Sequence, residues 1–261
     1  WKAAECNIPM FSHCEDKSLV DGGVMNAGAK AKELGLPGIT NAVEDVIVAR
    51  DIIMSKEAGC QLHLCHCSTK DSAVLIKMAK EQGLSVTGEV CPHHFTMSDD
   101  QITEDHGRFK MNPPLRSKED VEALRGALRD GIMDAISTDH APHGAKEKNQ
   151  SMKKAPFGIV GIENSFALGY TELVKGYLTL SQLVEKMSVN PAKILHLDKG
   201  NLAQGRTADV IIADLSTEYA IDTNDFFSKG KNTPFEGKKV YGRIETTIVD
   251  GKIVYQLESE K

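Results

Sequence analysis

Four short segments combine histidine, cysteine and acidic side chains at the ends of apolar runs. They read SHCED (residues 12–16), CHCST (65–69), CPHH (91–94) and STDHAPH (137–143). Imidazole and carboxylate groups bind zinc and similar divalent ions, and they also transfer protons. A metal-dependent catalytic site is therefore the first hypothesis, provided that the fold brings these segments together.

The two-residue periodicity of a β-strand sorts the histidines of the second segment. Across residues 61–67, Leu62, Leu64 and His66 share one face, and His63 lies on the other. Because His66 stands at the end of the strand, we expect it to be the inward ligand. We expect His63 to pack between strand and helix.

Three strand ends could each direct one group into a common site, namely His13, His66 and Asp139. Two imidazoles and a carboxylate suit zinc or a similar ion and leave one coordination position for water. Each residue alone is better explained as a hydrogen-bonded histidine or a helix-capping aspartate. Together, at equivalent positions on successive strands, they favour the metal site. His140 points the other way by alternation and is expected to be structural.

Two loops offer polar groups to a ligand. Asn112 precedes two prolines, which stiffen the chain, and its amide can both donate and accept, as an amide-like or ureide ligand requires. A turn-forming asparagine is the equal alternative. After Pro156, the backbone amides of Phe157 and Gly158 could face a ligand. The charged segment that precedes this loop, residues 143–154, is expected to be mobile and solvated.

Three further histidines have less certain roles. His93 and His94 follow a proline, and either could orient a metal ligand, contact substrate or serve the packing alone. His143 stands beyond the bend at Pro142, which leaves it free to reach a substrate.

Alternating strands and helices must position these groups. Apolar runs predict strands over residues 8–13, 61–67, 85–91 and 132–138, and helical periodicity predicts helices over 40–58, 69–82, 117–130, 159–175 and 179–187. This alternation implies parallel strands with the site at their carboxyl ends. A (βα) barrel fits better than an open sheet because four consecutive strand ends carry reactive residues.

The pattern changes after residue 197, where β-branched, alternating segments replace the helices. We predict a hydrolase-barrel portion over residues 1–197 and an accessory β module over 198–261. The sequence begins at Trp1 without an initiator methionine and holds only half of a barrel's strands. We therefore expect an amino-terminal part of the natural protein to be absent here.

Composition limits the class of protein. The 261 residues carry a net charge of −6 and a pI near 5.9, which disfavours binding to nucleic acid or to an anionic membrane. No apolar run is long enough to span a bilayer. The six cysteines form no spaced framework, which indicates free thiols in a reducing cytosol. We expect a cytoplasmic protein that acts on a small molecule.

Seven longer motifs follow one another along the chain: FSHCED, CHCSTKDS, EVCPHHF, KMNPPLRS, STDHAPH, KAPFGIVGIE and NTPFEGKKVYG. In sequence and in order they resemble bacterial type I dihydroorotases of the amidohydrolase superfamily, over essentially the whole chain. The resemblance implies a distorted (βα)8 TIM-type barrel, of which this chain holds about strands 5 to 8, with part of a small β-sandwich. It also implies zinc-dependent interconversion of N-carbamoyl-L-aspartate and L-dihydroorotate in de novo pyrimidine biosynthesis.

The resemblance assigns roles residue by residue. His13 resembles the metal ligand of the fifth strand, His66 that of the sixth, and Asp139 the eighth-strand aspartate that binds metal and shuttles a proton. One or two zinc ions are implied, together with a homodimer and, in some relatives, an assembly with aspartate transcarbamoylase. The family's substrate contacts match Asn112, His143, Pro156, Phe157 and Gly158.

The departure from the family is large. No His-x-His pair occurs in this sequence, and the first-strand ligands, the following substrate-binding Arg and Asn, and the fourth-strand bridging group are not found. We expect the remaining zinc ligands in the absent amino-terminal part, and we expect the isolated chain to be inactive. A hydantoinase or allantoinase, and a non-catalytic dihydroorotase-like assembly subunit, remain as alternatives.

Overall fold

The computed structural model describes residues 1–174 and 176–257. Its central feature is a four-stranded parallel sheet in the order β1-β4-β5-β6. The four strands are β1 (Met10–Ser12), β4 (Leu62–Leu64), β5 (Val86–Val90) and β6 (Ala135–Ile136). Each lies inside a predicted strand, so the predicted positions are confirmed, with shorter bounds.

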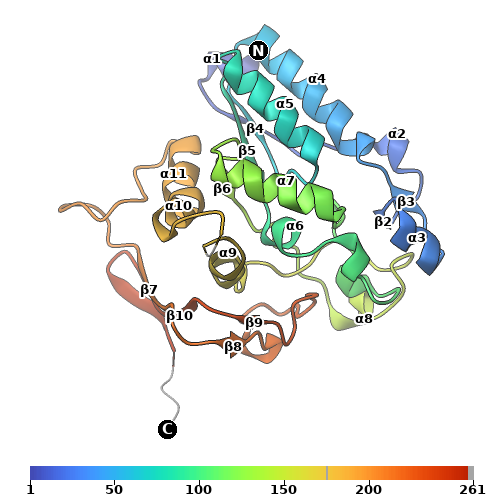
Figure 1. Cartoon of the computed structure of the whole chain (residues 1–261). Coiled ribbons are helices and arrows are strands. Elements are labelled where there is room, and N and C mark those ends of the chain that lie inside the picture. Colours follow the sequence, from blue (N-terminus) through green and yellow to red (C-terminus); the bar gives the residue numbers. More distant parts are fainter. Residues whose placement is uncertain (175, 258–261) are drawn as a thin grey trace.

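Three helices lie side by side over one face of this sheet (Figure 1): α4 (Ala42–Ala58), α5 (Lys70–Glu81) and α7 (Lys118–Arg129). Their ends follow from local chemistry. The Thr69 side chain accepts from the Ser72 amide at the start of α5, and Ser117 and Asp120 form the predicted capping box of α7. Gly59 ends α4 in a left-handed conformation.

The main apolar core lies between the sheet and these helices. Leu62 and Leu64 of β4 pack there with Ile76 of α5 and Leu124 of α7. Since alternate strand residues point to opposite faces, the residues between them face away from the helices. That second face carries His63, Thr87 and Glu89, together with the Phe11 ring.

His63 corrects the sequence prediction, because it does not pack between strand and helix. It lies on the polar face, where Thr87 Oγ1 is 2.8 Å from its Nδ1 and Glu89 Oε2 is 3.0 Å from its Nε2. Its ring also lies 4.6 Å from that of Phe11, its neighbour on β1. Strand alternation puts His63 on one face of the sheet and Leu62 and Leu64 on the other, and the helices cover the face that carries the leucines.

The remaining elements are short and join or flank this unit. A two-stranded parallel sheet pairs β2 (Met25–Asn26) with β3 (Gly38–Ile39). The predicted helix over residues 159–175 begins later, because Ile159 pairs with His140 in a β-bridge, and Lys175 lies outside the described residues. The other α-helices of the described residues are α1 (Lys2–Glu5), α2 (Lys17–Val20), α3 (Ala29–Leu34), α6 (Pro92–Thr96), α8 (Ala145–Lys148), α9 (Ser165–Leu173), α10 (Leu180–Val184) and α11 (Asn190–Ile194), and a π-helix, Glu185–Val189, joins the last two.

The later strands form separate antiparallel sheets, seen below the parallel sheet in Figure 1. One sheet contains β7 (Val210–Asp214), β10 (Arg243–Val249) and β11 (Lys252–Gln256), and the other pairs β8 (Tyr219–Ala220) with β9 (Lys239–Val240). Asp250 and Gly251 form the turn between β10 and β11, both with positive φ. The domain boundary at residue 197 stays a prediction, and residues 258–261 of the second predicted domain lie outside the described range.

Candidate active site

The carboxyl ends of β1 and β4 bring two of the predicted metal ligands into contact. His13 directly follows β1, and His66 comes two residues after β4. His13 Nδ1 lies 2.8 Å from His66 Nε2, and the two rings meet edge to face. Because neighbouring parallel strands end at the same edge of a sheet, residues 53 positions apart become neighbours.

A local change of backbone conformation turns His66 toward His13. By simple alternation His66 would share the helix-covered face with Leu62 and Leu64, but its φ is +37°. Asp139, past the end of β6, also has a positive φ, of +46°. Left-handed backbone is uncommon outside glycine and costs on the order of 1 kcal/mol, and it clusters at functional sites. The strand ends are therefore shaped for the placement of these two side chains.

Asp139 shares the electrostatic environment of the two imidazoles. Burial raises the pKa of Asp139, and the imidazoles of His66 and His13 oppose the rise. Burial also lowers the pKa of His66, which favours the neutral ring that a metal ligand requires. Among the described residues, however, the ligand atoms of His13, His66 and Asp139 do not all lie within 4.8 Å of one another. The structure brings the histidines together and leaves the carboxylate further out.

The donor set fits a divalent ion. His66 Nδ1 is buried and has no hydrogen-bond partner among the described residues, and His66 Nε2 faces a second imidazole nitrogen. Ligand nitrogens stand ~2.0–2.1 Å from zinc, so two nitrogens this close can bind one ion. Imidazole nitrogens with a nearby carboxylate match the chemistry of zinc.

Glu15 is a site residue that the sequence prediction missed. Its Oε2 lies 3.5 Å from His13 Nε2, and its Oε1 accepts a 2.8 Å hydrogen bond from Asn112 Nδ2. The carboxylate therefore faces the second nitrogen of a predicted metal ligand and holds the predicted substrate contact as well. Its position in the HCED motif, two residues after His13, was the available signal.

Glu89 is the second missed residue. It accepts from His63 Nε2 at 3.0 Å and from the His66 backbone amide at 3.2 Å. Although burial opposes the effect, hydrogen bonds from His63 and Ser137 hold the pKa of Glu89 below its ordinary value. A stable carboxylate under His66 thus fixes the backbone that carries this ligand.

The adjacent histidines of the third segment serve packing and loop placement. His93 and His94 are buried, and His94 Nε2 donates to the Pro113 carbonyl at 3.0 Å, next to Asn112. Burial lowers the pKa of His93 to about 3, so its ring is neutral. Together with Cys91, these rings form the one group of three such donors within 4.8 Å among the described residues.

His143 lies against the loop of residues 156–158, so two of the predicted substrate contacts are neighbours, and their role toward a substrate stays a prediction. Its Nε2 donates to the Phe157 carbonyl at 2.8 Å, and its backbone amide donates to Asn232 Oδ1 at 3.2 Å. Gly158 has φ +121°, and a Cβ there would stand 2.6 Å from the Ala141 Cβ. Only glycine fits this close contact.

Two expectations about this region need revision. The Gly158 amide donates to the Lys110 carbonyl at 3.1 Å, so it is not available to a ligand. The charged segment 143–154 is not fully solvated, because Lys148 and Met152 are buried. His140 matches its expected structural role, since its Nδ1 accepts from the Gly161 amide at 3.1 Å.

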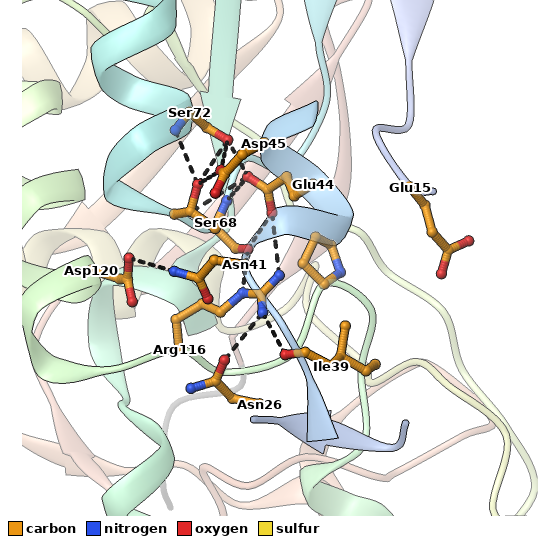
Figure 2. Close-up of polar contacts among 12 residues, drawn as sticks. Glu15, Asn26, Ile39, Asn41, Glu44, Asp45, Ser68, Ser72, Arg116 and Asp120 are labelled. Carbon is orange, nitrogen blue, oxygen red and sulfur yellow. Dashed lines mark hydrogen bonds and ion pairs between the residues drawn. The ribbon is translucent and has the colours of Figure 1, made fainter. Parts of the chain in front are cut away.

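A buried polar network supports the chain just after His66 (Figure 2). Arg116 donates to Ser68 Oγ at 3.0 Å, to Asn26 Oδ1 at 3.1 Å and to the Ile39 carbonyl at 3.0 Å. Its guanidinium also lies 3.8 Å from Glu44, which accepts from the Ser68 amide at 2.8 Å. One guanidinium therefore ties the loop after β4 to β2, β3 and α4.

Comparisons with known proteins place the chain in a family and identify its fold. The amidohydrolase family profile matches residues 2–254. The chain is 48% identical over 258 residues to a dihydroorotase of Staphylococcus epidermidis, covering 98% of this chain and 61% of that protein. It is 49% identical over 257 residues to a dihydroorotase of Macrococcus caseolyticus, covering 98% and 60%. The chain thus spans about 60% of the length of these relatives.

Solved structures extend the comparison. A dihydropyrimidinase from Brevibacillus agri superposes with a TM-score of 0.87 at 26% identity, covering 98% of this chain and 58% of that one. An L-hydantoinase from Arthrobacter aurescens gives 0.85 at 31% identity, with 98% and 58% covered. With the parallel sheet, these likenesses confirm the predicted fold class, part of a (βα)8 TIM-type barrel. Within the described residues, no helix has the length and apolarity that a membrane crossing demands.

Proposed function

This chain belongs to the amidohydrolase family, and we propose that it supplies the carboxyl-terminal half of the active site of a zinc-dependent dihydroorotase. The reaction is the reversible interconversion of N-carbamoyl-L-aspartate and L-dihydroorotate in pyrimidine biosynthesis. The observation that carries the proposal is the contact between His13 and His66 at adjoining strand ends, with Asp139 electrostatically linked to both. The identity to dihydroorotases supports this substrate.

The metal would be held by His13 and His66, with Asp139 as the third ligand and further ligands outside this chain. When bound, it would act as a Lewis acid toward the ring carbonyl and make the attacking water more acidic. The buried environment that raises the pKa of Asp139 suits a group that must accept and return a proton.

Asp139 is assigned the proton transfer. In the hydrolytic direction, water adds to the ring amide carbonyl and the carbon–nitrogen bond of the ring breaks. Asp139 takes the proton of the attacking water and delivers it to the departing nitrogen, and ring closure reverses these steps. Asn112, held by Glu15, and His143, beside Phe157, orient the amide and carboxylate groups of the substrate.

A substrate panel tests the proposal. The complete polypeptide that carries this chain would be loaded with zinc and assayed with dihydroorotate, hydantoin and allantoin. We expect dihydroorotate to have the highest kcat/KM. A higher value for hydantoin or allantoin would replace the proposed substrate, and zinc-independent turnover of dihydroorotate would refute the metal assignment.

A hydantoinase is the second candidate, favoured by the likeness to the Brevibacillus agri and Arthrobacter aurescens structures. The higher identity to dihydroorotases weighs against it. The retained His13, His66 and Asp139 weigh against a non-catalytic assembly subunit, since a subunit without catalysis has no need of them. We further propose a cytoplasmic homodimer that can associate with aspartate transcarbamoylase.

A further inference from the structure

Lys148 is a fully buried ammonium group directly behind the loop of residues 156–158. Its exposed fraction is 0%. Its Nζ donates to the carbonyl oxygens of Gly158 at 2.7 Å, Pro156 at 2.8 Å and Lys110 at 3.0 Å. An ammonium group has three donors and no acceptor, so the three carbonyls satisfy it completely. The loop is thus built around one positive charge.

Lys110 places a second ammonium group beside the same loop. Its Nζ donates to the carbonyls of Met152 at 2.6 Å and Ala155 at 2.7 Å. It also lies 4.2 Å from the centroid of the Phe157 ring, a cation–π contact. Both lysines therefore hold the segment that leads into the predicted substrate contact.

Within residues 1–174 and 176–257, the hydrogen bonds of both ammonium groups go to carbonyl oxygens, and neither group forms an ion pair. Burial and the neighbouring Lys110 charge lower the pKa of Lys148 to about 8, and burial lowers the pKa of Lys110. Buried charges are normally paired because their desolvation is costly. Two unpaired cations next to a candidate active site point to a negatively charged ligand.

The geometry also connects Lys148 to a specific donor. In a trans peptide the carbonyl and the following N–H point in opposite directions. Because the Pro156 carbonyl points at Lys148, the Phe157 N–H points away from it, and this N–H has no hydrogen-bond partner in the described part of the chain. The Gly158 amide is already used by Lys110. The Phe157 N–H is therefore the free donor of the loop.

We infer that Lys148 positions the Phe157 N–H for the substrate, and that the unpaired charges of Lys148 and Lys110 make the site select anionic cyclic amides over neutral ones. The inference rests on the proposed function and names the residues behind its substrate class. The lysines lie behind the loop, so they act through its backbone and through the electrostatic potential, without direct contact to the substrate.

The test compares two ligands that differ by one charge. Orotate and its neutral carboxamide, orotamide, would be titrated as competitive inhibitors of the complete, zinc-loaded polypeptide. The variants are Lys148→Met and Lys110→Met, which keep the length of the side chain and remove the charge. Lys154→Met is the matched control, since it removes an exposed ammonium group two residues before the loop.

We expect each buried-lysine variant to lower the preference for orotate over orotamide about tenfold, a size that charge interactions reach at an effective dielectric constant of ~20. Lys154→Met should change this preference less than about twofold, because water screens exposed charges. In Lys148→Met, KM for dihydroorotate should rise more than kcat falls. Lys110→Met leaves Lys148 with its carbonyl partners. If the preference for orotate over orotamide is unchanged in this variant, the charge selection is overturned. Wild-type protein that neither binds orotate nor hydrolyses dihydroorotate would instead refute the proposed function.

Discussion

His13 Nδ1 and His66 Nε2 lie 2.8 Å apart although 53 positions separate them in the chain. The parallel pairing of β1 with β4 sets this distance, and the left-handed backbone of His66 turns its ring toward His13. The chemical roles proposed for Asp139, Glu15 and the loop of residues 156–158 are defined relative to this contact.

Asp139→Asn should abolish turnover of dihydroorotate in the complete enzyme and leave the fold largely intact. The amide cannot accept and return the proton, and loss of such a group costs ~10²–10⁴-fold in rate. Steady-state kcat and thermal unfolding would be measured together. Asp130→Asn, which changes an exposed aspartate paired with Arg129, is the control. Retained activity in the Asp139 variant would refute its role.

Glu15→Gln should weaken zinc binding without removing a ligand. The amide still accepts from Asn112, but it loses the negative charge that faces His13 Nε2. Loss of such an orienting partner typically costs ~10–100-fold in metal affinity, which competition with a chelator would measure. Glu33→Gln changes an exposed carboxylate paired with Lys30 and should leave the affinity unchanged. Equal affinities in both variants would contradict the role of Glu15.

Arg116→Met should lower the free energy of unfolding by about 3–5 kcal/mol, because it leaves the buried Glu44 carboxylate without its cation. Chemical denaturation would measure this loss. Adding Glu44→Gln should recover part of it, since the second change removes the stranded charge. If the double variant is no more stable than the single one, the Arg116–Glu44 interaction is not the cause.

Lys148 should give stability a defined pH dependence. Its pKa is about 8 in the folded protein against an ordinary 10.5, so the unfolded chain binds more protons at this position between these values. The free energy of unfolding should therefore rise with pH across this window, relative to Lys148→Met. Denaturation of both proteins at several pH values within the window would measure the difference. A difference that stays flat or falls with pH would contradict the lowered pKa.

The purified 261-residue chain by itself should not hydrolyse dihydroorotate. Within the described part of the chain, strand β1 pairs with β4 alone, and its Met10 and Phe11 are 47% and 44% exposed. A strand with one unpaired edge and exposed apolar side chains does not hold the residues of a site rigidly. Activity assays and metal analysis of this chain check the expectation. Two bound zinc ions with turnover would overturn it.

Local sequence determined the helices and strands, and also which strand ends carry the polar motifs. The capping residues Thr69 and Ser117 and the terminal Gly59 define helix ends through contacts within a few residues, so they can be predicted without the fold. The same holds for the four strands, whose apolar runs are bounded by polar motifs. His13 and His66 could be chosen as a pair because parallel strands end at one edge.

Tertiary structure alone decided which face each strand buries and which charges lie inside. Alternation divides the residues of β4 into two sets but cannot tell which set the helices cover, so His63 was misplaced. Lys148 lies in a highly charged segment, and its burial became visible only in the fold, where the Lys110 carbonyl, 38 positions away, joins those of Pro156 and Gly158 around its Nζ. The physical reason is that burial and charge pairing depend on atoms far apart in the chain, whereas caps, turns and strand periodicity depend on near neighbours.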